Sequence, residues 1–405
     1  GEDDDVESLN SHPLSSLDAL VLSPELFTDS GISRVEIDNV GRIIVNRSLD
    51  MQAYSDIELH GTQVLVTSDI TSAGGNVELG ASLTIAGKEL NTLIGNDYPV
   101  LKDATTSIVK VDGNIDVSGY WVNDTFADSG QQVAVPVVTQ GGSISLVSDR
   151  DVVLTADSLL NVSGGGYLDT DGKFTAGKGG EILLSSASSD DDLRPSSVLP
   201  SLDIQGELRG FGLKAGGELS IEAESIRIRD AGSDVVASSD FLLHGNEYFS
   251  QVVDELNGRN VLLVDADITQ LGGFSSYEFS AVGSSSVNDA GVVVEAGTTI
   301  DLVSATPVVD ATGILLSAAN AGDASDVFAN NPDPLELVPT KTDIDRFTYL
   351  DVLPEYERSP VDLVLSNLSE GQVEIGTGAV ITGEAGASIT PVSYTHLRAH
   401  ETIHA

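Results

Sequence analysis

The stretch from Gly141 to Gly166 reads GGSISLVSDRDVVLTADSLLNVSGGG. It contains three short runs in which apolar and polar residues alternate, which is typical of β-strands with one buried face. The inward-facing apolar pairs are Ile144/Leu146, Val152/Leu154 and Leu160/Val162. Three short faces, about eight residues apart, are typical of one coil of a parallel β-helix.

The segment Gly216 to Asp230, GGELSIEAESIRIRD, shows how such a chain turns corners. Apolar residues keep one parity up to Ala223 and take the other parity from Ile226 onward. A slip of one residue moves every following side chain to the other face of a sheet. The slip at Glu224 and Ser225 therefore predicts a corner between two strands that share one core.

The pattern Gly-Gly-x-apolar-x-apolar occurs four times, starting at Gly74, Gly141, Gly179 and Gly216. The last three starts lie 38 and 37 residues apart, which fits two coils of about 19 residues or one coil with longer loops. A longer repeat relates GISRVEI at 31–37 to GFSSYEF at 273–279. At about 20 residues per coil, we expect on the order of fifteen coils and a rod of about 60 to 80 Å.

These patterns predict an all-β chain folded as a parallel β-helix (β-solenoid) with loop excursions. The expected β-helix segments are 25–230, 271–318 and 361–390. Residues 1–24 read as an acidic leader or as a continuation of preceding coils. Interruptions of the pattern predict excursions at 188–199, 231–270 and 319–360, the second with a short outer helix over 241–256. Loops inserted between coils are the expected place for any binding site.

The tail at 391–405, PVSYTHLRAHETIHA, breaks with the rest of the chain, because the alternation and the acidic bias both stop there. The run SYTHLRAHET at 393–402 resembles a translated sequencing adapter, so we interpret the tail as non-native. The alternative is a helical cap whose His396 and His400 have the spacing of a metal-ligand pair.

Composition excludes several function classes. With 63 Asp and Glu against 19 Lys and Arg, the net charge of −44 repels phosphate backbones, so nucleic acid is not an expected partner. The chain has no cysteine, which removes disulfides and thiolate chemistry. It shows neither a signal peptide nor an apolar run long enough to span a membrane. With one Met, at position 51, the sequence reads as a piece of a longer protein.

Metal and catalytic motifs are not found. Asp169 and Asp171 fit two positions of a calcium loop, but Tyr167 and Lys178 occupy positions that require carboxylates. We therefore expect no metal site, no cofactor and no catalytic residue. His12, His60 and His244 lie far apart without a nucleophile motif, so a catalytic triad has no support either.

Three further residue groups have a functional and a structural interpretation. Carboxylates on adjacent coils serve β-helical enzymes that cleave polysaccharides, and Asp190, Asp191, Asp192 and Arg194 offer such a set. In a chain this acidic, a solvated loop is the simpler interpretation. We expect Glu222, Glu224, Arg227 and Arg229 to form an exposed face with weakly paired charges. For the aromatic residues Tyr120, Trp121, Phe274 and Tyr277, we expect core or corner packing rather than sugar stacking.

The family resemblance rests on the Gly-Gly coils and on three longer blocks. These are GNIDVSGYWVND at 113–124, VSGGGYLDTDGKFTAGKGGEILL at 162–184 and GGFSSYEFSAVG at 272–283. Over about residues 22–390, the chain resembles the repetitive rod of filamentous haemagglutinin-type exoproteins. The resemblance implies a right-handed β-helix in a large protein secreted by a Gram-negative bacterium and exported by two-partner secretion through an outer-membrane β-barrel transporter. The N-terminal secretion domain that such a transporter recognises is not among these residues.

The sequence thus predicts a rod segment of a secreted or cell-surface adhesin that attaches to cells or surfaces and catalyses no reaction. Its partners would be the transporter during export and an unidentified host-cell, glycan or surface receptor. The alternative, from another class, is a β-helical polysaccharide hydrolase or lyase.

Overall fold

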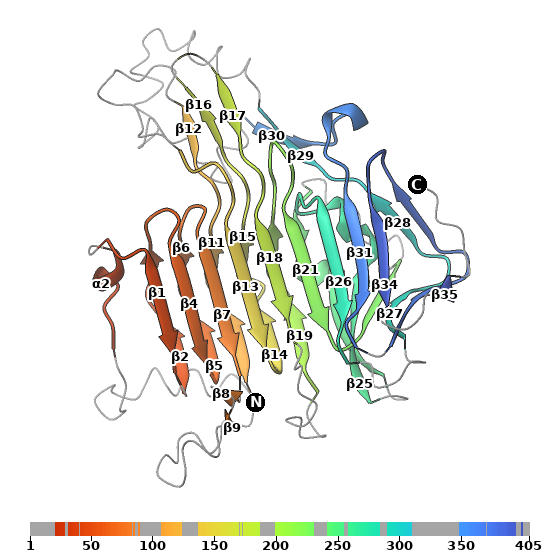
Figure 1. Cartoon of the computed structure of the whole chain (residues 1–405), viewed down its shortest axis with the longest axis horizontal. Coiled ribbons are helices and arrows are strands. Elements are labelled where there is room, and N and C mark those ends of the chain that lie inside the picture. The colour runs from red at the N-terminus through yellow and green to blue at the C-terminus, as the bar shows by residue number, and fades with distance from the viewer. Residues whose placement is uncertain are drawn as a thin grey trace.

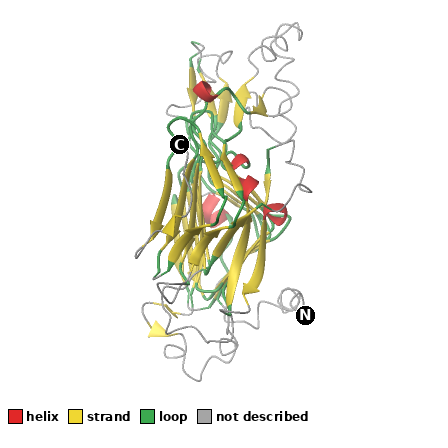
Figure 2. Ribbon diagram, turned by 90° about the vertical axis from the view of Figure 1, so that its right-hand side faces the viewer, coloured by secondary structure: helices red, strands yellow, loops and turns green. Residues whose placement is uncertain are grey.

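The computed structural model of the chain describes residues 21–28, 31–39, 41–82, 84–85, 88–89, 107–123, 137–169, 171, 173–186, 199–230, 241–254, 258–283, 290–309, 348–369, 371–393 and 398–399. These residues form a parallel β-helix whose strands line three faces around one apolar core (Figure 1). Figure 2, turned by 90°, looks onto the C-terminal end of this stack.

The first face is a parallel sheet of nine strands, one from each coil (Figure 1). In spatial order the strands are β1 (Arg34–Asp38), β4 (Asp56–Gly61), β7 (Asn76–Ala81), β13 (Ser143–Ser148), β18 (Glu181–Ser185), β21 (Glu218–Ala223), β26 (Ser276–Ala281), β31 (Asp362–Asn367) and β34 (Ile389–Ser393). Their order in space is their order along the chain, as expected when each coil adds one layer.

The second face consists of two sheets. The first contains β2 (Arg42–Val45), β5 (Gln63–Val66), β10 (Ile108–Val111), β14 (Asp151–Leu154) and β19 (Ser201–Ile204). The second contains, in order, β24 (Phe249–Asp254), β25 (Arg259–Asp265), β22 (Ile226–Arg229), β27 (Ala290–Val294), β32 (Gln372–Ile375) and β35 (Arg398–Ala399). Gln251 joins the two sheets, because its side chain accepts a hydrogen bond from Ser201 and donates one to the carbonyl of Leu202.

The third face has the shortest strands. One sheet contains β3 (Leu49–Asp50), β6 (Ile70–Thr71), β11 (Asn114–Asp116), β15 (Leu159–Asn161), β20 (Glu207–Arg209) and β23 (Leu243–His244). Further along, β28 (Thr299–Leu302) pairs with β33 (Val380–Gly383). The 3₁₀ helix η4 (Ala266–Gln270) packs beside β28, where Thr269 donates a hydrogen bond to the carbonyl of Asp301 at 2.8 Å.

Several short elements lie outside the three faces. Three of them, at the upper edge in Figure 1, form a small sheet: β12 (Trp121–Asn123), β16 (Gly166–Leu168) and β17 (Phe174–Ala176). The others are β8 (Thr84–Ile85) paired with β9 (Lys88–Glu89), β29 (Thr306–Val309) paired with β30 (Thr348–Asp351), the helices α2 (Glu25–Thr28) and α4 (Gly245–Tyr248), and the 3₁₀ helix η5 (Glu355–Glu357).

The structure confirms the expected coil and its corners. The three predicted inward pairs of 141–166 lie in β13, in β14, and in and just after β15, one pair for each face, and all six side chains are buried. The phase slip at Glu224 and Ser225 separates β21 on the first face from β22 on the second. Sequence alternation thus identifies both the strands and the turns between faces.

The coil length and the number of coils differ from expectation. Register partners on the first face are 38 residues apart between β13 and β18, so the repeat is one coil with loops and not two coils of 19. Elsewhere this spacing ranges from 20 residues between β4 and β7 to 86 between β26 and β31. Within the described residues the first face has nine strands, fewer than the expected number of about fifteen coils. At about 4.8 Å per strand, these nine strands span about 38 Å, less than the expected 60 to 80 Å.

The segment 231–270 is predicted to be an excursion, but its described residues, 241–254 and 258–270, contribute two strands to the second face. Within 241–256, the helix α4 has four residues and the chain then continues as β24. β24 pairs antiparallel with β25, and β25 pairs parallel with β22. Leu262 and Val264 of β25 are buried in the core. The hairpin therefore adds two strands to the second face between β19 and β22, whereas β18 and β21 are direct neighbours on the first face.

The remaining predicted segments are only partly covered by the described residues, which include 21–24 of the segment 1–24 and Leu199 of the excursion 188–199. In the predicted excursion 319–360, residues 348–360 contain β30 and η5, and 319–347 lie outside the described part. In the predicted tail, Pro391 to Ser393 belong to β34 and pair with β31. His396 and His400 lie outside the described residues. No helix in the described part is long and apolar enough to cross a membrane.

Candidate functional site

A groove of about 640 Å³ lies on the outer side of the second face. Four neighbouring strands, β25, β22, β27 and β32, supply most of its lining, together with the turns that follow β27 and β32. Its charged residues are Arg227, Asp254, Arg259, Glu295 and Glu374, and its uncharged polar side chains include Ser225 and Thr377.

Strand alternation places these side chains. Ile226 and Ile228 are buried, so Arg227 between them points outward. Arg227 pairs in register with Val293 of the next coil, and Val293 pairs with Glu374 of the coil after that. Residues more than 140 positions apart therefore stand in one outward row.

The groove combines two guanidinium groups with three carboxylates. The Nε atom of Arg227 lies 3.7 Å from a carboxylate oxygen of Glu295, and both side chains are about two-fifths exposed, at 39% and 41%. Such exposed pairs contribute little to stability. The groove therefore offers both hydrogen-bond donors and acceptors to a polar ligand.

One member of the predicted outer ladder is not on the surface. Glu224 is 5% exposed, and its carboxylate accepts a hydrogen bond from the backbone N–H of Asn260 at 2.9 Å. The corner between β21 and β22 turns this residue inward, where it binds the start of β25. Glu222 stays on the outer side, where its carboxylate accepts a hydrogen bond from Ser185 at 2.8 Å.

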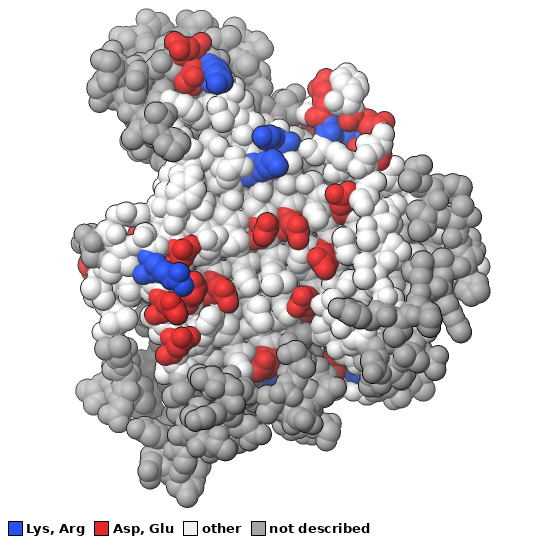
Figure 3. All heavy atoms as spheres, in the orientation of Figure 1, with Lys and Arg blue, Asp and Glu red and all other residues white. Residues whose placement is uncertain are grey.

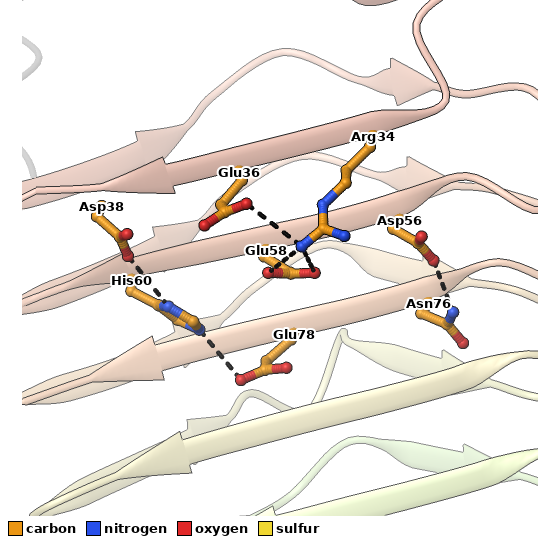
Figure 4. A network of polar contacts seen from close by, with 8 residues as sticks. All are labelled: Arg34, Glu36, Asp38, Asp56, Glu58, His60, Asn76 and Glu78. Carbon is orange, nitrogen blue, oxygen red and sulfur yellow. Dashed lines mark hydrogen bonds and ion pairs between the residues drawn. The ribbon is translucent and has the colours of Figure 1, made fainter.

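Polar side chains also form rows on the outer side of the first face (Figure 3). Figure 4 shows the first three strands, in which Arg34 lies 3.0 Å from the carboxylate of Glu58. The ring nitrogens of His60 lie 3.2 Å from Asp38 and 3.1 Å from Glu78. His60, one of the three dispersed histidines, is thus part of a ladder of polar contacts across three coils.

The other candidates from the sequence are not brought together. His244 contacts Glu207, at 3.8 Å. Asp169 closes the β16–β17 hairpin, because its carboxylate accepts hydrogen bonds from the N–H groups of Asp171 and Lys173. In the described ranges, no three His, Asp or Glu side chains are grouped as metal ligands. His12, Asp190, Asp191, Asp192 and Arg194 lie outside these ranges.

The four aromatic candidates divide into buried and exposed residues. Phe274 and Tyr277 are fully buried, with their rings edge to face at 6.0 Å. The Tyr277 hydroxyl donates a hydrogen bond to the carbonyl of Leu271, and burial raises the pKa of this hydroxyl far above its ordinary value. Trp121 is 9% exposed, and Tyr120 is 37% exposed. Burial is therefore confirmed for Phe274, Tyr277 and Trp121, whereas the Tyr120 side chain is exposed.

No protein-family model, no curated protein and no solved structure matches this chain. What the chain does must therefore be inferred from its fold, its surface and its sequence.

Proposed function

We propose that the chain is a structural rod segment of a secreted bacterial surface protein or adhesin, which mediates attachment to cells or surfaces without catalysis. The observation that carries this proposal is the unbroken ladder of buried side chains on the first face. Val77, Ile144, Ile182, Leu219 and Tyr277 are in-register neighbours on five successive strands, and each is at most 1% exposed.

Such a core supports extension along one axis. Each coil buries its apolar side chains only against its neighbours, so coils can be added without changing the rest of the fold. The outer faces then present rows of polar side chains that are fixed by the backbone. Attachment requires this kind of large and rigid surface more than it requires an enclosed active site.

The location of the protein follows from the family resemblance of the sequence. We propose that it is secreted or held at the surface of a Gram-negative bacterium after two-partner secretion through an outer-membrane β-barrel transporter. The absence of cysteine and the charge of −44 are compatible with this route. The receptor on the contacted cell or surface is a separate question.

Attachment is tested with beads that carry the full chain. We expect them to adhere to at least one of a panel of epithelial cells, bacterial cells and abiotic surfaces. Beads that carry Leu184→Asp are the control, since a charge at this fully buried position disrupts the core. Equal adhesion of both kinds of bead to every surface would reject the proposal.

A second candidate is a polysaccharide hydrolase or lyase, and the groove on the second face favours it. Asp254, Glu295 and Glu374 provide carboxylates for general acid or base catalysis, and Arg227 and Arg259 are placed among them. This function predicts release of reducing ends or unsaturated products from a glycan panel. Activity should fall at least about 100-fold in Glu295→Gln and stay unchanged in Glu36→Gln, a carboxylate of the first face. No product from any glycan would exclude it.

A further inference from the structure

The exposed aromatic side chains of the described residues all lie on one edge of the β-helix. They are Tyr54, Tyr120, Phe174 and Tyr356, with exposed fractions of 54%, 37%, 42% and 85%. Each belongs to a connection that leads from the third face to the first face. The other aromatic side chains described on the faces and corners are buried or partly buried.

Three of these residues precede strands that are evenly spaced along the stack. Tyr54 precedes β4, Phe174 precedes β18 and Tyr356 precedes β31, which are the second, fifth and eighth strands of the first face. Each step is therefore three layers, or about 14 Å. In Figure 1 the small sheet with β17 and the turn beside β30 rise from the same upper edge.

The Phe174 ring packs over the backbone of Gly166. A methyl group at Gly166 would lie 2.6 Å from the Phe174 ring and 3.1 Å from the Trp121 ring, so both rings cover this glycine. The hairpin that carries Phe174 is closed by the hydrogen bonds of Asp169. The ring is thus presented from a paired strand and not from a free loop.

Tyr356 lies in the 3₁₀ helix η5, and residues on both sides of it contact the segment 384–385. The Glu355 carboxylate accepts a hydrogen bond from the backbone N–H of Ala385 at 3.0 Å. Arg358 and Glu384 form an ion pair in which both side chains are at most 14% exposed. The Tyr356 side chain nevertheless stands in solvent. Tyr54 is fixed in another way, since it adopts a φ of 61° and donates its N–H to the carbonyl of Ala73.

The charges beside these rings favour an uncharged ligand. Glu355 and Glu357 flank Tyr356. In the hairpin of Phe174, Asp169 and Asp171 outnumber the one cation, Lys173. Carboxylates accept hydrogen bonds from hydroxyl groups and repel anions. Aromatic rings bury apolar ligand faces with little loss of side-chain entropy. A chain of neutral sugars offers both hydroxyl groups and apolar C–H faces.

We propose that this edge binds a neutral polysaccharide, which runs along the stack and packs its sugar rings on Tyr54, Phe174 and Tyr356. The inference rests on the proposed attachment function, to which it adds the chemical class of the contacted surface. It is independent of the groove on the second face, which contributes no residue to this edge.

Affinity electrophoresis in native gels with mixed-linkage β-glucan, galactomannan or dextran tests the proposal, with alginate as the anionic comparison. We expect at least one neutral polysaccharide to retard the full chain and alginate to have no effect. Phe174→Ala and Tyr356→Ala should each weaken binding at least tenfold. Tyr356→Phe keeps the ring and should bind as the unchanged chain does. Val253→Ala, a substitution at a 55% exposed site on β24, should also have no effect.

A second readout uses Trp121, the one tryptophan of the chain. Because it contacts Gly166 beside Phe174, its fluorescence should change when the polysaccharide binds, and this change should be lost in Phe174→Ala. Binding of alginate alone, or retardation that persists in Phe174→Ala and Tyr356→Ala, would overturn the proposal. Beads that adhere equally with and without these rings would overturn it while leaving the attachment function intact. Beads that adhere nowhere would refute the attachment function itself.

Discussion

At the scale of single residues, the Gly-Gly pairs show how closely the coils approach each other. The second glycines of three pairs, Gly75, Gly142 and Gly180, stack on one another where the chain enters the first face. A Cβ atom on Gly142 would lie 1.8 Å from the carbonyl oxygen of Gly75, and one on Gly180 would lie 1.8 Å from that of Gly142. Backbone contact therefore requires the glycine in the repeat.

Gly142→Ala should lower the free energy of unfolding by at least about 2 kcal/mol, because the backbone of Gly75 cannot move aside without separating two coils. Ser143→Ala changes the next residue, whose half-buried side chain donates a hydrogen bond to Asn76, and should cost at most about 1 kcal/mol. Urea titration followed by circular dichroism measures both. Equal values for the two variants would show that the coils can separate at little cost.

Asp267 in η4 is expected to destabilise the fold at neutral pH. Partial burial raises its pKa above the ordinary 3.8, and the nearby carboxylates of Asp265, Asp230 and Asp301 raise it further. Because the folded-state pKa lies above the unfolded one, the ionised form costs free energy at pH 7. This cost disappears as the pH falls below the unfolded value.

Asp267→Asn should therefore raise the melting temperature at pH 7 and leave it unchanged near pH 3, below the ordinary pKa of 3.8. Asp157→Asn, in an exposed turn, provides the comparison. Thermal melts of the three proteins across this pH range decide the point. A lower melting temperature for Asp267→Asn at pH 7 would mean that its carboxylate stabilises η4 instead.

At the scale of strands, what the sequence predicts depends on whether only one side of a strand is buried. β21 alternates buried and half-buried residues, so both its orientation and the corner after Ala223 follow from the pattern. β25 reads RNVLLVD, and five successive residues from Val261 to Asp265 are buried. Without alternation, the periodicity that identifies a strand is absent. The sequence pattern therefore predicts an excursion for this segment.

The position of β25 in the wall is testable. Leu262→Ala removes a side chain that is 1% exposed and should cost about 2 to 5 kcal/mol. Val253→Ala on β24 changes a side chain that is 55% exposed and should cost less than about 0.5 kcal/mol. Unfolding free energies measure the difference. If Leu262→Ala lowered the free energy of unfolding only slightly, this segment would be an outer loop and not part of the second face.

The groove could not be predicted because it depends on how coils stack. Arg227, Val293 and Glu374 form one row only because their strands are in register. The sequence separation between such partners varies from coil to coil with the length of the loops. The burial of Glu224 could not be predicted either, because alternation does not determine which of the two corner residues turns inward.

At the scale of the whole molecule, part of the negative charge is arranged in rows on the first face. The outer side of the first face has ten carboxylates on its described strands, and the basic side chains there are Arg34 and His60. Glu36, Glu58 and Glu78 are register neighbours on three successive strands. Glu181 and Glu218 form a further pair of like-charged neighbours, which has no cation in register beside it.

These rows predict that salt stabilises the protein. Like charges on neighbouring strands, about 4.8 Å apart, repel each other, and the distance over which they do so falls from about 30 Å at 0.01 M salt to about 8 Å at 0.15 M. The melting temperature should therefore rise as NaCl is increased over this range.

Glu218→Gln removes one repulsive neighbour of Glu181, so it should raise the melting temperature at low salt and have less effect at high salt. Ser145→Ala, on the same face but uncharged, should follow the salt dependence of the unchanged chain. If melting temperatures do not change with salt, or if Glu218→Gln lowers them, the carboxylate rows must be neutralised by bound cations or by other parts of the chain.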